Sequence, residues 1–235
     1  MKRLASLLLT VVALFSFLGI STAETDITIA PMNRYVMKVV ESFPTDGSNP
    51  YWWPKTNEYD GATTDVYFMG KKVMRGDPAD QCRSYCCGLT LQVFYLALQE
   101  YEKAGNTIPP YPLTPEKSGN FKWLWFCPEV KSPGPLLALE EYKMGRKITH
   151  FEEAIPGDFV QLWRNNGSGH SVIFIDWERD DTGKIKALKY WSTQPVTKGI
   201  GLRVEPIGGG DKDITREHLY IGRLDLPDKW PKPQQ

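Results

Sequence analysis

Apolar residues in the first half of the chain recur at helical spacing in three segments. Residues 30–43 (APMNRYVMKVVESF) and residues 134–145 (GPLLALEEYKMG) show this period and are bounded by proline or glycine. Residues 81–103 form the longest segment, and Ser84 is its expected N-cap. Its apolar stripe consists of Cys87, Leu91, Phe94, Leu98 and Tyr101. We therefore expect three helices, the longest of which faces the core along this stripe.

The second half of the chain changes to the residue types and short runs of β-strands. Turn residues such as RNNGSG, RDDTG and GGGDKD separate these runs. The expected strands are residues 158–163, 170–177, 184–193, 201–207 and 218–226. Helices followed by strands predict an α+β domain in which one antiparallel sheet packs on the 81–103 helix. The Pro-rich tail from Leu226 is expected to form a strap on the surface.

Length and charge narrow the class of protein. The 235 residues include 8 Trp and 11 Tyr, which argues against disorder, and we expect one domain over residues 24–235. The 28 Lys and Arg balance the 28 Asp and Glu, and no basic run exceeds a few residues. The long-range attraction that drives binding to nucleic acid or to anionic membranes therefore has no visible source.

The first 23 residues have the organisation of a signal peptide. A short basic start, MKR, is followed by an apolar run, and Ser21 and Ala23 occupy the positions that a signal peptidase reads. A membrane anchor would need roughly 20 continuous apolar residues, whereas serines and threonines interrupt this run. We expect residues 1–23 to be removed, which predicts a secreted or periplasmic protein without stable membrane insertion.

The four cysteines conflict with the usual disulfide pattern of an exported protein. An oxidising compartment favours two disulfides, but a chemically active Cys86 must remain a thiol. Cys82, Cys87 and Cys127 then share at most one disulfide, and the sequence does not choose the pair. A zinc site is the alternative, yet the C-x3-C-C spacing lacks the usual C-x2-C pair. We expect no metal or other cofactor, and Cys87 is expected in the core.

Cys86 lies off the apolar stripe, in the first turn of the expected helix. Free backbone N–H groups and the helix dipole stabilise a thiolate at this position. The same N–H groups can bind the oxyanion that forms when a thiolate attacks a carbonyl. Cys86 is therefore the candidate nucleophile.

A nucleophilic cysteine needs a base, and the chain has three histidines. His170 opens an expected strand directly after the NNGSG turn, so its ring would lie at the end of the sheet. His150 lies among charged residues, and His218 heads the last strand, so both suit the surface. The plain alternative for His170 is a strand-end histidine bonded to a loop carbonyl.

The base in turn needs a polar group that orients its ring. Alternation along KYWSTQ places Tyr190, Ser192 and Gln194 on one face of the following strand. We prefer Gln194, which is nearest the strand end and has an amide acceptor. Ser192 and Tyr190 remain alternatives.

Three short motifs then carry a family resemblance. YCCGLT, PGDFVQLW and GHSVIFI occur in this order, and the region 81–207 resembles the NlpC/P60 and CHAP-like papain-fold cysteine peptidases and amidases. Their pattern is Asp-Cys-Ser-Gly-Leu-Thr, then Pro-Gly-Asp, then Gly-His-Val at the head of a strand. The resemblance implies a papain-like fold with Cys86 as nucleophile and His170 as base. This chain departs from the pattern at Tyr85, which replaces the aspartate, and has no histidine in the third position.

Other residues have both a functional and a plain interpretation. Gln81 could donate to the oxyanion, as an upstream glutamine does in papain-type enzymes, but a loop glutamine facing water is the better expectation. Asp158 is expected to bond its own backbone. The aromatic residues Tyr51, Trp52 and Trp53 could bind substrate in a groove or could equally cover the core.

These observations predict an exported cysteine hydrolase that cleaves amide bonds through Cys86, His170 and Gln194. The resemblance implies a substrate in cell-wall peptidoglycan, such as the bond between D-Glu and a diamino acid of the stem peptide. One alternative is an inactive module that binds wall peptides or glycans. Another is an acyltransferase or thioesterase, which would need an apolar groove at Cys86. The exact bond and the oligomeric state remain open.

Overall fold

The computed structural model describes residues 31–233, so the predicted signal peptide lies outside the described residues. The helices are α1 (Pro31–Ser42), α2 (Cys86–Lys103), α3 (Ser118–Trp125) and α4 (Pro135–Glu141). A small hairpin is formed by β1 (Val66–Phe68) and β2 (Lys71–Met74). The remaining strands are β3 (Gly145–Lys147), β4 (Phe159–Arg164), β5 (Gly169–Arg179), β6 (Ile185–Gln194), β7 (Gly199–Pro206) and β8 (Ile214–Leu224).

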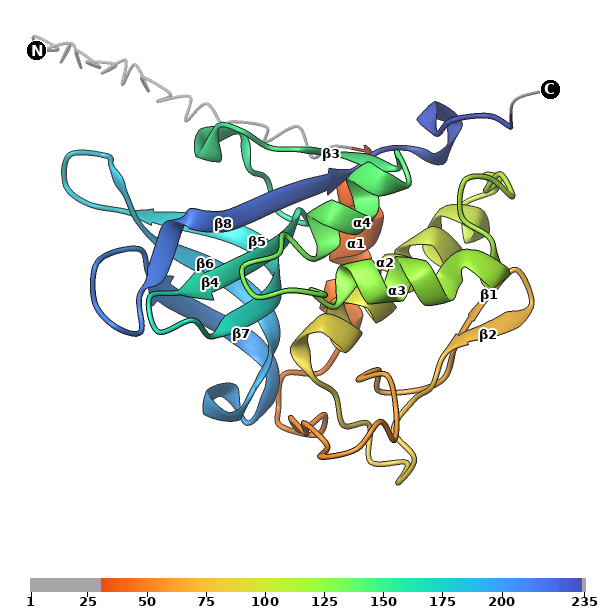
Figure 1. Ribbon diagram of the computed structural model, residues 1–235, viewed down its shortest axis with the longest axis horizontal. Helices are drawn as coiled ribbons and strands as arrows, with labels where there is room; N and C mark the ends of the chain where they lie inside the picture. Colours follow the sequence, from red (N-terminus) through yellow and green to blue (C-terminus); the bar gives the residue numbers. More distant parts are fainter. Residues whose placement is uncertain (1–30, 234–235) are drawn as a thin grey trace, which may run out of the picture.

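The six later strands form one antiparallel sheet in the order β3-β8-β4-β5-β6-β7. The helices lie between this sheet and the β1–β2 hairpin (Figure 1). The sheet is buried on both faces. Phe159, Ile173 and Trp191 face the helical core, and a second cluster that includes Val172 and Leu188 fills the opposite face. The predicted α+β class, with helices on a C-terminal antiparallel sheet, is confirmed.

The regular spacing of apolar residues predicted the longer helices and strands. Several shorter elements were missed. Every residue of the predicted α2 stripe is buried, and all five predicted strands form. The β1–β2 hairpin, α3 and β3 were not predicted. Each has eight residues or fewer, which leaves few repeats of a periodic pattern. Helix α4 is equally short, but the apolar run over residues 134–145 revealed it. Within residues 31–233, no helix has the length and apolar character needed to cross a membrane.

One boundary of the predicted elements was wrong, and the C-terminal tail has a role beyond the predicted one. Helix α4 ends at Glu141 instead of residue 145, because the chain turns at Lys143 (φ 52°) to enter β3. The Pro-rich tail lies on the surface, as predicted, but it also contributes to the core, because Trp230 is buried. The Trp230 indole N–H donates to the Asp225 carbonyl at 3.1 Å and holds the tail in place.

Asp158 has a structural role, as expected from its position between a turn and β4. Its fully buried carboxylate accepts the backbone N–H of Ile155 at 3.0 Å and the side-chain amide of Asn33 at 2.8 Å. Arg223 of β8 donates to both carboxylate oxygens at 2.8 Å. This one side chain thus joins α1, the turn before β4 and β8.

The amino end of α2 differs from the sequence prediction. Tyr85, and not Ser84, is the N-cap residue, with extended backbone (φ −132°, ψ 162°) and no side-chain cap. The backbone of Ser84 is held in a bridge, in which its N–H donates to the Pro50 carbonyl at 3.1 Å and its carbonyl accepts from Trp52 at 2.9 Å. Cys86 therefore becomes the first helical residue, and the first-turn N–H groups have no side-chain cap.

Gly88 allows a loop to cross the first turn of α2 at very short range. A Cβ atom at residue 88 would lie 2.1 Å from the Asp60 carbonyl oxygen and 2.5 Å from backbone atoms of Gly61. The same loop is fixed to the helix by the Tyr85 N–H, which donates to the Gly61 carbonyl at 3.2 Å. The glycine after the paired cysteines is therefore required by packing.

We predict that Gly88→Ala destabilises the protein by about 2 kcal/mol or more, because the methyl group overpacks a contact between two backbones. The measurement is the urea midpoint of unfolding at unchanged m-value. Gly119→Ala in α3 is the matched control, because a Cβ there meets nothing within 4 Å. It should be neutral or stabilising by up to about 1 kcal/mol. Equal midpoints for the two variants would contradict this account of Gly88.

Candidate active site

Cys86 and His170 line one cavity of about 190 Å³. Cys86 is the first residue of α2, and His170 is the second residue of β5. The residues that line the cavity are Trp53, Cys86, Cys87, Phe126, Cys127, Gln161, Trp163, Gly169, His170 and Ser171. The structure thus brings together the two residues that the sequence singled out for nucleophile and base, although they lie 84 positions apart in the chain (170 − 86).

The surroundings of Cys86 favour a thiolate. The pKa of the Cys86 thiol is well below its usual range, because a hydrogen bond from the Cys87 thiol stabilises the charged sulfur. Burial acts in the opposite direction, but the charge of His170, a hydrogen bond from its ring and the Ser171 backbone N–H all lower this pKa further. The free N–H groups of the α2 amino end add to the same effect.

Cys87 and Cys127 have the opposite character. Burial raises the pKa of Cys87 well above its usual range, and burial together with the nearby Cys86 charge raises the pKa of Cys127 to about 12. These two sulfurs are therefore neutral thiols beside a charged one. All four cysteines are unbonded thiols, so the disulfide considered for Cys82, Cys87 and Cys127 does not form here. Within residues 31–233, no group of three His, Cys, Asp or Glu side chains is arranged to hold a metal ion.

Packing against Tyr190 of β6 orients the His170 ring. Its ring is 6% exposed and meets the Tyr190 ring edge-on, with centroids 5.7 Å apart. Its Nε2 is buried without a hydrogen-bond partner among the described residues. When His170 is protonated, both ring nitrogens carry a proton and act as donors. The buried Nε2–H then needs a nearby acceptor.

Gln194 lies at the position that could supply this acceptor. The register that pairs Ile173 with Trp191, continued by three residues, sets His170 opposite Gln194. Gln194 Oε1 lies 3.2 Å from both the Tyr190 hydroxyl and Arg203 Nη1. The single Tyr190 proton has a shorter alternative in Glu205 Oε2, at 2.8 Å. Gln194 Oε1 therefore keeps capacity for one more donor, although no hydrogen bond joins it to His170.

The two alternatives for this third position have other partners. The Ser192 hydroxyl donates to the Ser171 carbonyl at 2.8 Å, which ties β6 to β5 behind the site. The Tyr190 hydroxyl is committed to Glu205 and Gln194. Of the three candidates, Gln194 is the one whose position and unused acceptor capacity fit the role.

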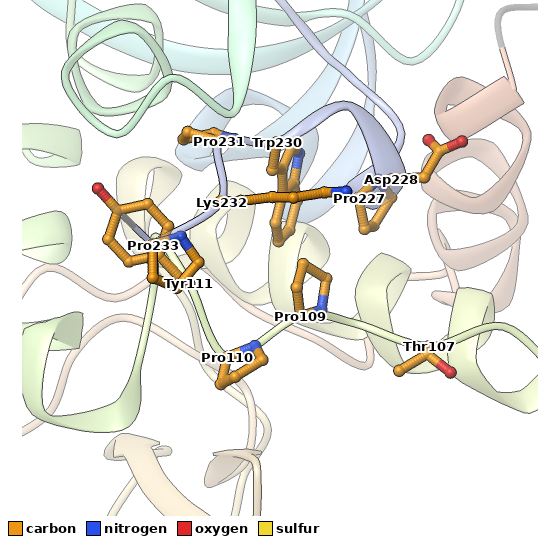
Figure 2. A pocket seen from close by; sticks show the side chains of 10 residues that line it. All are labelled: Thr107, Pro109, Pro110, Tyr111, Pro227, Asp228, Trp230, Pro231, Lys232 and Pro233. Carbon is orange, nitrogen blue, oxygen red and sulfur yellow. The ribbon is translucent and has the colours of Figure 1, made fainter. Parts of the chain in front are cut away.

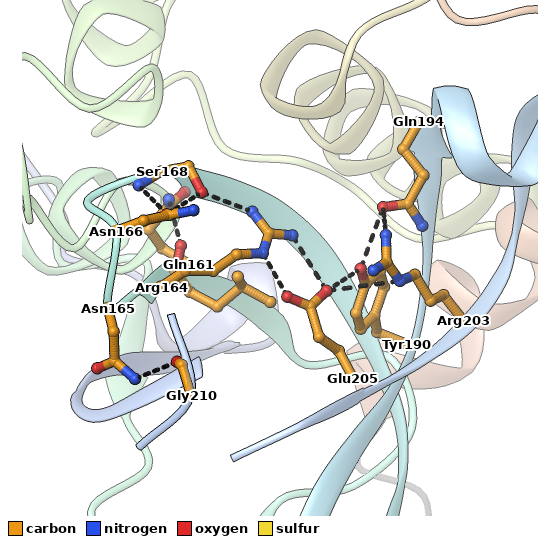
Figure 3. Close-up of polar contacts among 11 residues, drawn as sticks. Gln161, Arg164, Asn165, Asn166, Ser168, Tyr190, Gln194, Arg203, Glu205 and Gly210 are labelled. Carbon is orange, nitrogen blue, oxygen red and sulfur yellow. Dashed lines mark hydrogen bonds and ion pairs between the residues drawn. The ribbon is translucent and has the colours of Figure 1, made fainter. Parts of the chain in front are cut away.

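A buried ion-pair network around Glu205 holds the Gln194 side chain through Tyr190 and Arg203. Figure 3 shows Glu205 between Arg164 on one side and Tyr190, Gln194 and Arg203 on the other. Arg164 binds both carboxylate oxygens, with Nη2 at 3.0 Å from Oε2. Burial opposes the charge of Glu205, but the Arg164 hydrogen bonds and charge lower the pKa of this carboxyl below its usual range. Alternation along GLRVEPI places Arg203 and Glu205 on one face of the strand. This pattern could have indicated the network, but it did not enter the prediction.

Several residues singled out in the sequence lie outside the cavity. Gln81 is exposed and does not line it, so the oxyanion role considered for Gln81 has no structural basis. The Trp52 ring stacks on Tyr59 at 5.0 Å and lies under the Arg83 guanidinium at 3.7 Å, so it is half-buried against the core. Tyr51 is half-buried, and burial with the nearby Cys86 and Cys87 raises its pKa to about 12. Of the three aromatic residues, Trp53 alone lines the cavity.

The remaining histidines lie elsewhere. His218 Nδ1 is 3.1 Å from the Tyr220 hydroxyl, and His150 borders a separate surface hollow. Sequence reasoning did not identify Phe126, Cys127, Gln161 or Trp163 as lining residues. They come from other segments of the chain, and no local pattern links them to Cys86.

A second cavity of about 260 Å³ is larger but lacks reactive groups. Figure 2 shows its walls, where the loop before α3 meets the C-terminal tail. They consist of Thr107, Pro109, Pro110, Tyr111, Pro227, Asp228, Trp230, Pro231, Lys232 and Pro233. No cysteine or histidine is among them, so chemistry points to the Cys86 cavity despite its smaller volume.

Comparison with protein-family models, curated proteins and solved structures found no match to this chain.

We predict that Glu205→Gln destabilises the protein by about 3 kcal/mol at pH 7, because it leaves the buried Arg164 without its counter-charge. The lowered pKa of Glu205 means that its carboxylate stabilises the fold above the unfolded-state pKa of about 4.3. That contribution is lost as the pH falls further, through the folded-state pKa. The difference in urea midpoint between wild type and variant should therefore shrink below about pH 4.

Glu217→Gln is the control for this experiment, because Glu217 is exposed on β8 and forms no ion pair within residues 31–233. The urea midpoint of Glu217→Gln should equal that of wild type both at pH 7 and below about pH 4. A pH-independent loss in Glu205→Gln would show that the side chain contributes through shape alone.

Proposed function

We propose that this protein is a cysteine hydrolase of the papain-like NlpC/P60 type that cleaves amide bonds. One observation carries the proposal: Cys86 at the amino end of α2 and His170 at the start of β5 line the same cavity. The lowered pKa of Cys86 and the order of the YCCGLT, PGDF and GHSV motifs support it.

In the proposed reaction, the Cys86 thiolate attacks the carbonyl carbon and forms a C–S bond, while the carbonyl oxygen becomes an oxyanion. When this intermediate collapses, the C–N bond breaks and His170 gives its proton to the departing amine. Water then attacks the thioester as His170 accepts one of its protons. The C–S bond breaks, and the carboxylic acid and the Cys86 thiolate with protonated His170 are regained.

Backbone groups near the sulfur suit the oxyanion. The first N–H groups of α2 have no side-chain cap, and the Ser171 N–H contributes to the lowered pKa of Cys86. An oxyanion donor of this kind commonly contributes about 3 to 4 kcal/mol to transition-state stability. In this proposal, Gln194 positions the His170 ring from the opposite side.

The family resemblance extends the proposal to substrate and location. It suggests a peptide bond of cell-wall peptidoglycan, and the N-terminal sequence suggests export to the periplasm or the exterior. An inactive module that binds wall peptides or glycans remains the alternative, and it requires an unreactive Cys86.

Alkylation by iodoacetamide tests the proposal. Cys86 should be modified rapidly at pH 6, where ordinary thiols react slowly, because its lowered pKa keeps it charged. His170→Ala removes the neighbouring positive charge, so the pKa of Cys86 should rise and the rate at pH 6 should fall at least about tenfold. Mass spectrometry of tryptic peptides measures the rate at each cysteine.

His218→Ala is the matched control, since it removes a histidine outside the cavity. Its Cys86 rate should equal that of wild type, and half-buried Cys82 serves as an internal reference thiol. The hydrolase proposal would be overturned if Cys86 reacted no faster than Cys82, or if His170→Ala left the Cys86 rate unchanged. Either result would favour the binding module.

A further inference from the structure

The cavity at Cys86 contains no fixed charge for a charged substrate group. Among the described residues that line it, none is Asp, Glu, Lys or Arg. Cations on nearby segments are already paired: Arg83 with Asp77, Lys122 with Asp60, and Arg164 with Glu205. The Cys86 thiolate and the positive charge of His170 compensate each other in the cavity, so neither is left free to pair with a carboxylate. A charged group placed here would lose its hydration without gaining a partner.

Tyr85 organises one aromatic wall of this cavity. Its ring is buried against the rings of Trp53 at 4.5 Å and Phe126 at 6.0 Å, both of which line the cavity. Gly61 makes room for this ring, because a Cβ there would lie 2.5 Å from it. The residue that departs from the family pattern therefore builds an apolar wall directly beside the nucleophile.

Trp163 forms part of the remaining wall and is held at two points. Its indole N–H donates to the Ser132 carbonyl at 2.9 Å, so its polar atom is satisfied away from the cavity. A Cβ at Gly169 would lie 2.8 Å from the Trp163 ring, which shows how closely the strand packs on that ring. The aromatic surface is thereby fixed in place before any ligand enters.

The size of the cavity suits one side chain. Drug-sized ligands occupy about 300 Å³ or more, whereas an apolar cavity of about 150 Å³ can bind benzene. A volume of about 190 Å³ therefore fits a single aromatic or aliphatic group. In a cysteine hydrolase the acyl group stays bonded to the sulfur until water releases it, so a cavity built around that sulfur holds the acyl side of the substrate.

We propose that the Tyr85–Trp53–Phe126 wall selects substrates whose acyl residue is uncharged and apolar, and that it disfavours a glutamyl residue. This inference rests on the proposed cysteine hydrolase and names its substrate class. It directs the search toward amide bonds that follow an aromatic or aliphatic residue, and away from the bond after D-Glu.

Chloromethyl ketones test this selectivity at Cys86 itself. The probes are the N-acetyl-phenylalanyl, N-acetyl-alanyl and N-acetyl-glutamyl chloromethyl ketones, each in L and D forms, and mass spectrometry gives the rate of Cys86 modification. Each rate is divided by the iodoacetamide rate of the same protein, which removes differences in thiol reactivity. The faster phenylalanyl isomer should exceed the faster glutamyl isomer at least about tenfold at pH 7.

Trp53→Ala should reduce the phenylalanyl advantage at least about fivefold when each rate is divided by the iodoacetamide rate of the same variant. Trp123→Ala is the matched control, because Trp123 is 59% exposed, Trp53 is 58% exposed, and Trp123 does not line the cavity. It should behave as wild type. Substitution of Trp53 thus separates recognition from the reactivity of the sulfur.

A glutamyl probe that reacts as fast as the phenylalanyl probe, or a ratio that Trp53→Ala leaves unchanged, would overturn the selectivity. If Cys86 still reacts rapidly with iodoacetamide in a His170-dependent manner, the hydrolase itself survives that result. A Cys86 that is slow with every reagent would overturn both proposals together.

Discussion

The close contact between the Asp60–Gly61 loop and the first turn of α2 is the constraint on which the site depends. Because residue 88 is glycine, the Asp60 carbonyl can occupy the space that the Cβ of any other residue would fill. Tyr85 donates its backbone N–H to the same loop. These contacts fix where the helix begins. Because the helix begins at Cys86, the sulfur lies among free N–H groups and faces the end of β5.

The same contact determines the polarity of the cavity. Gly61 gives the Tyr85 ring a place to pack, and that ring supports Trp53 and Phe126. These apolar rings lie beside Cys86, and charges next to apolar groups interact more strongly than they would in solvent. One local packing arrangement therefore supplies both the activated sulfur and the surface that a neighbouring acyl group would meet.

The sequence predicted the helices and strands in which apolar residues are regularly spaced, and it singled out Cys86 and His170 for the site. Cys86 and His170 each follow a local signal, a helix start and a turn before a strand. Ser84 was misread because its backbone pairs with Tyr51, a contact between residues 33 positions apart (84 − 51) that no capping rule contains. Glu205 and Arg164 were missed for the same reason, since their ion pair crosses from β7 to β4.

In the proposed hydrolase, Gln194 would take the third position, in which the family pattern leads one to expect a residue that orients the His170 ring. Gln194 is neutral, and its oxygen already accepts from Arg203, which fixes the amide so that its remaining lone pair can serve His170 Nε2. The charge of the buried Glu205 is already matched by Arg164, and its carboxylate also accepts the Tyr190 hydroxyl. The positive charge of His170 then acts on Cys86, where it lowers the pKa of the thiol.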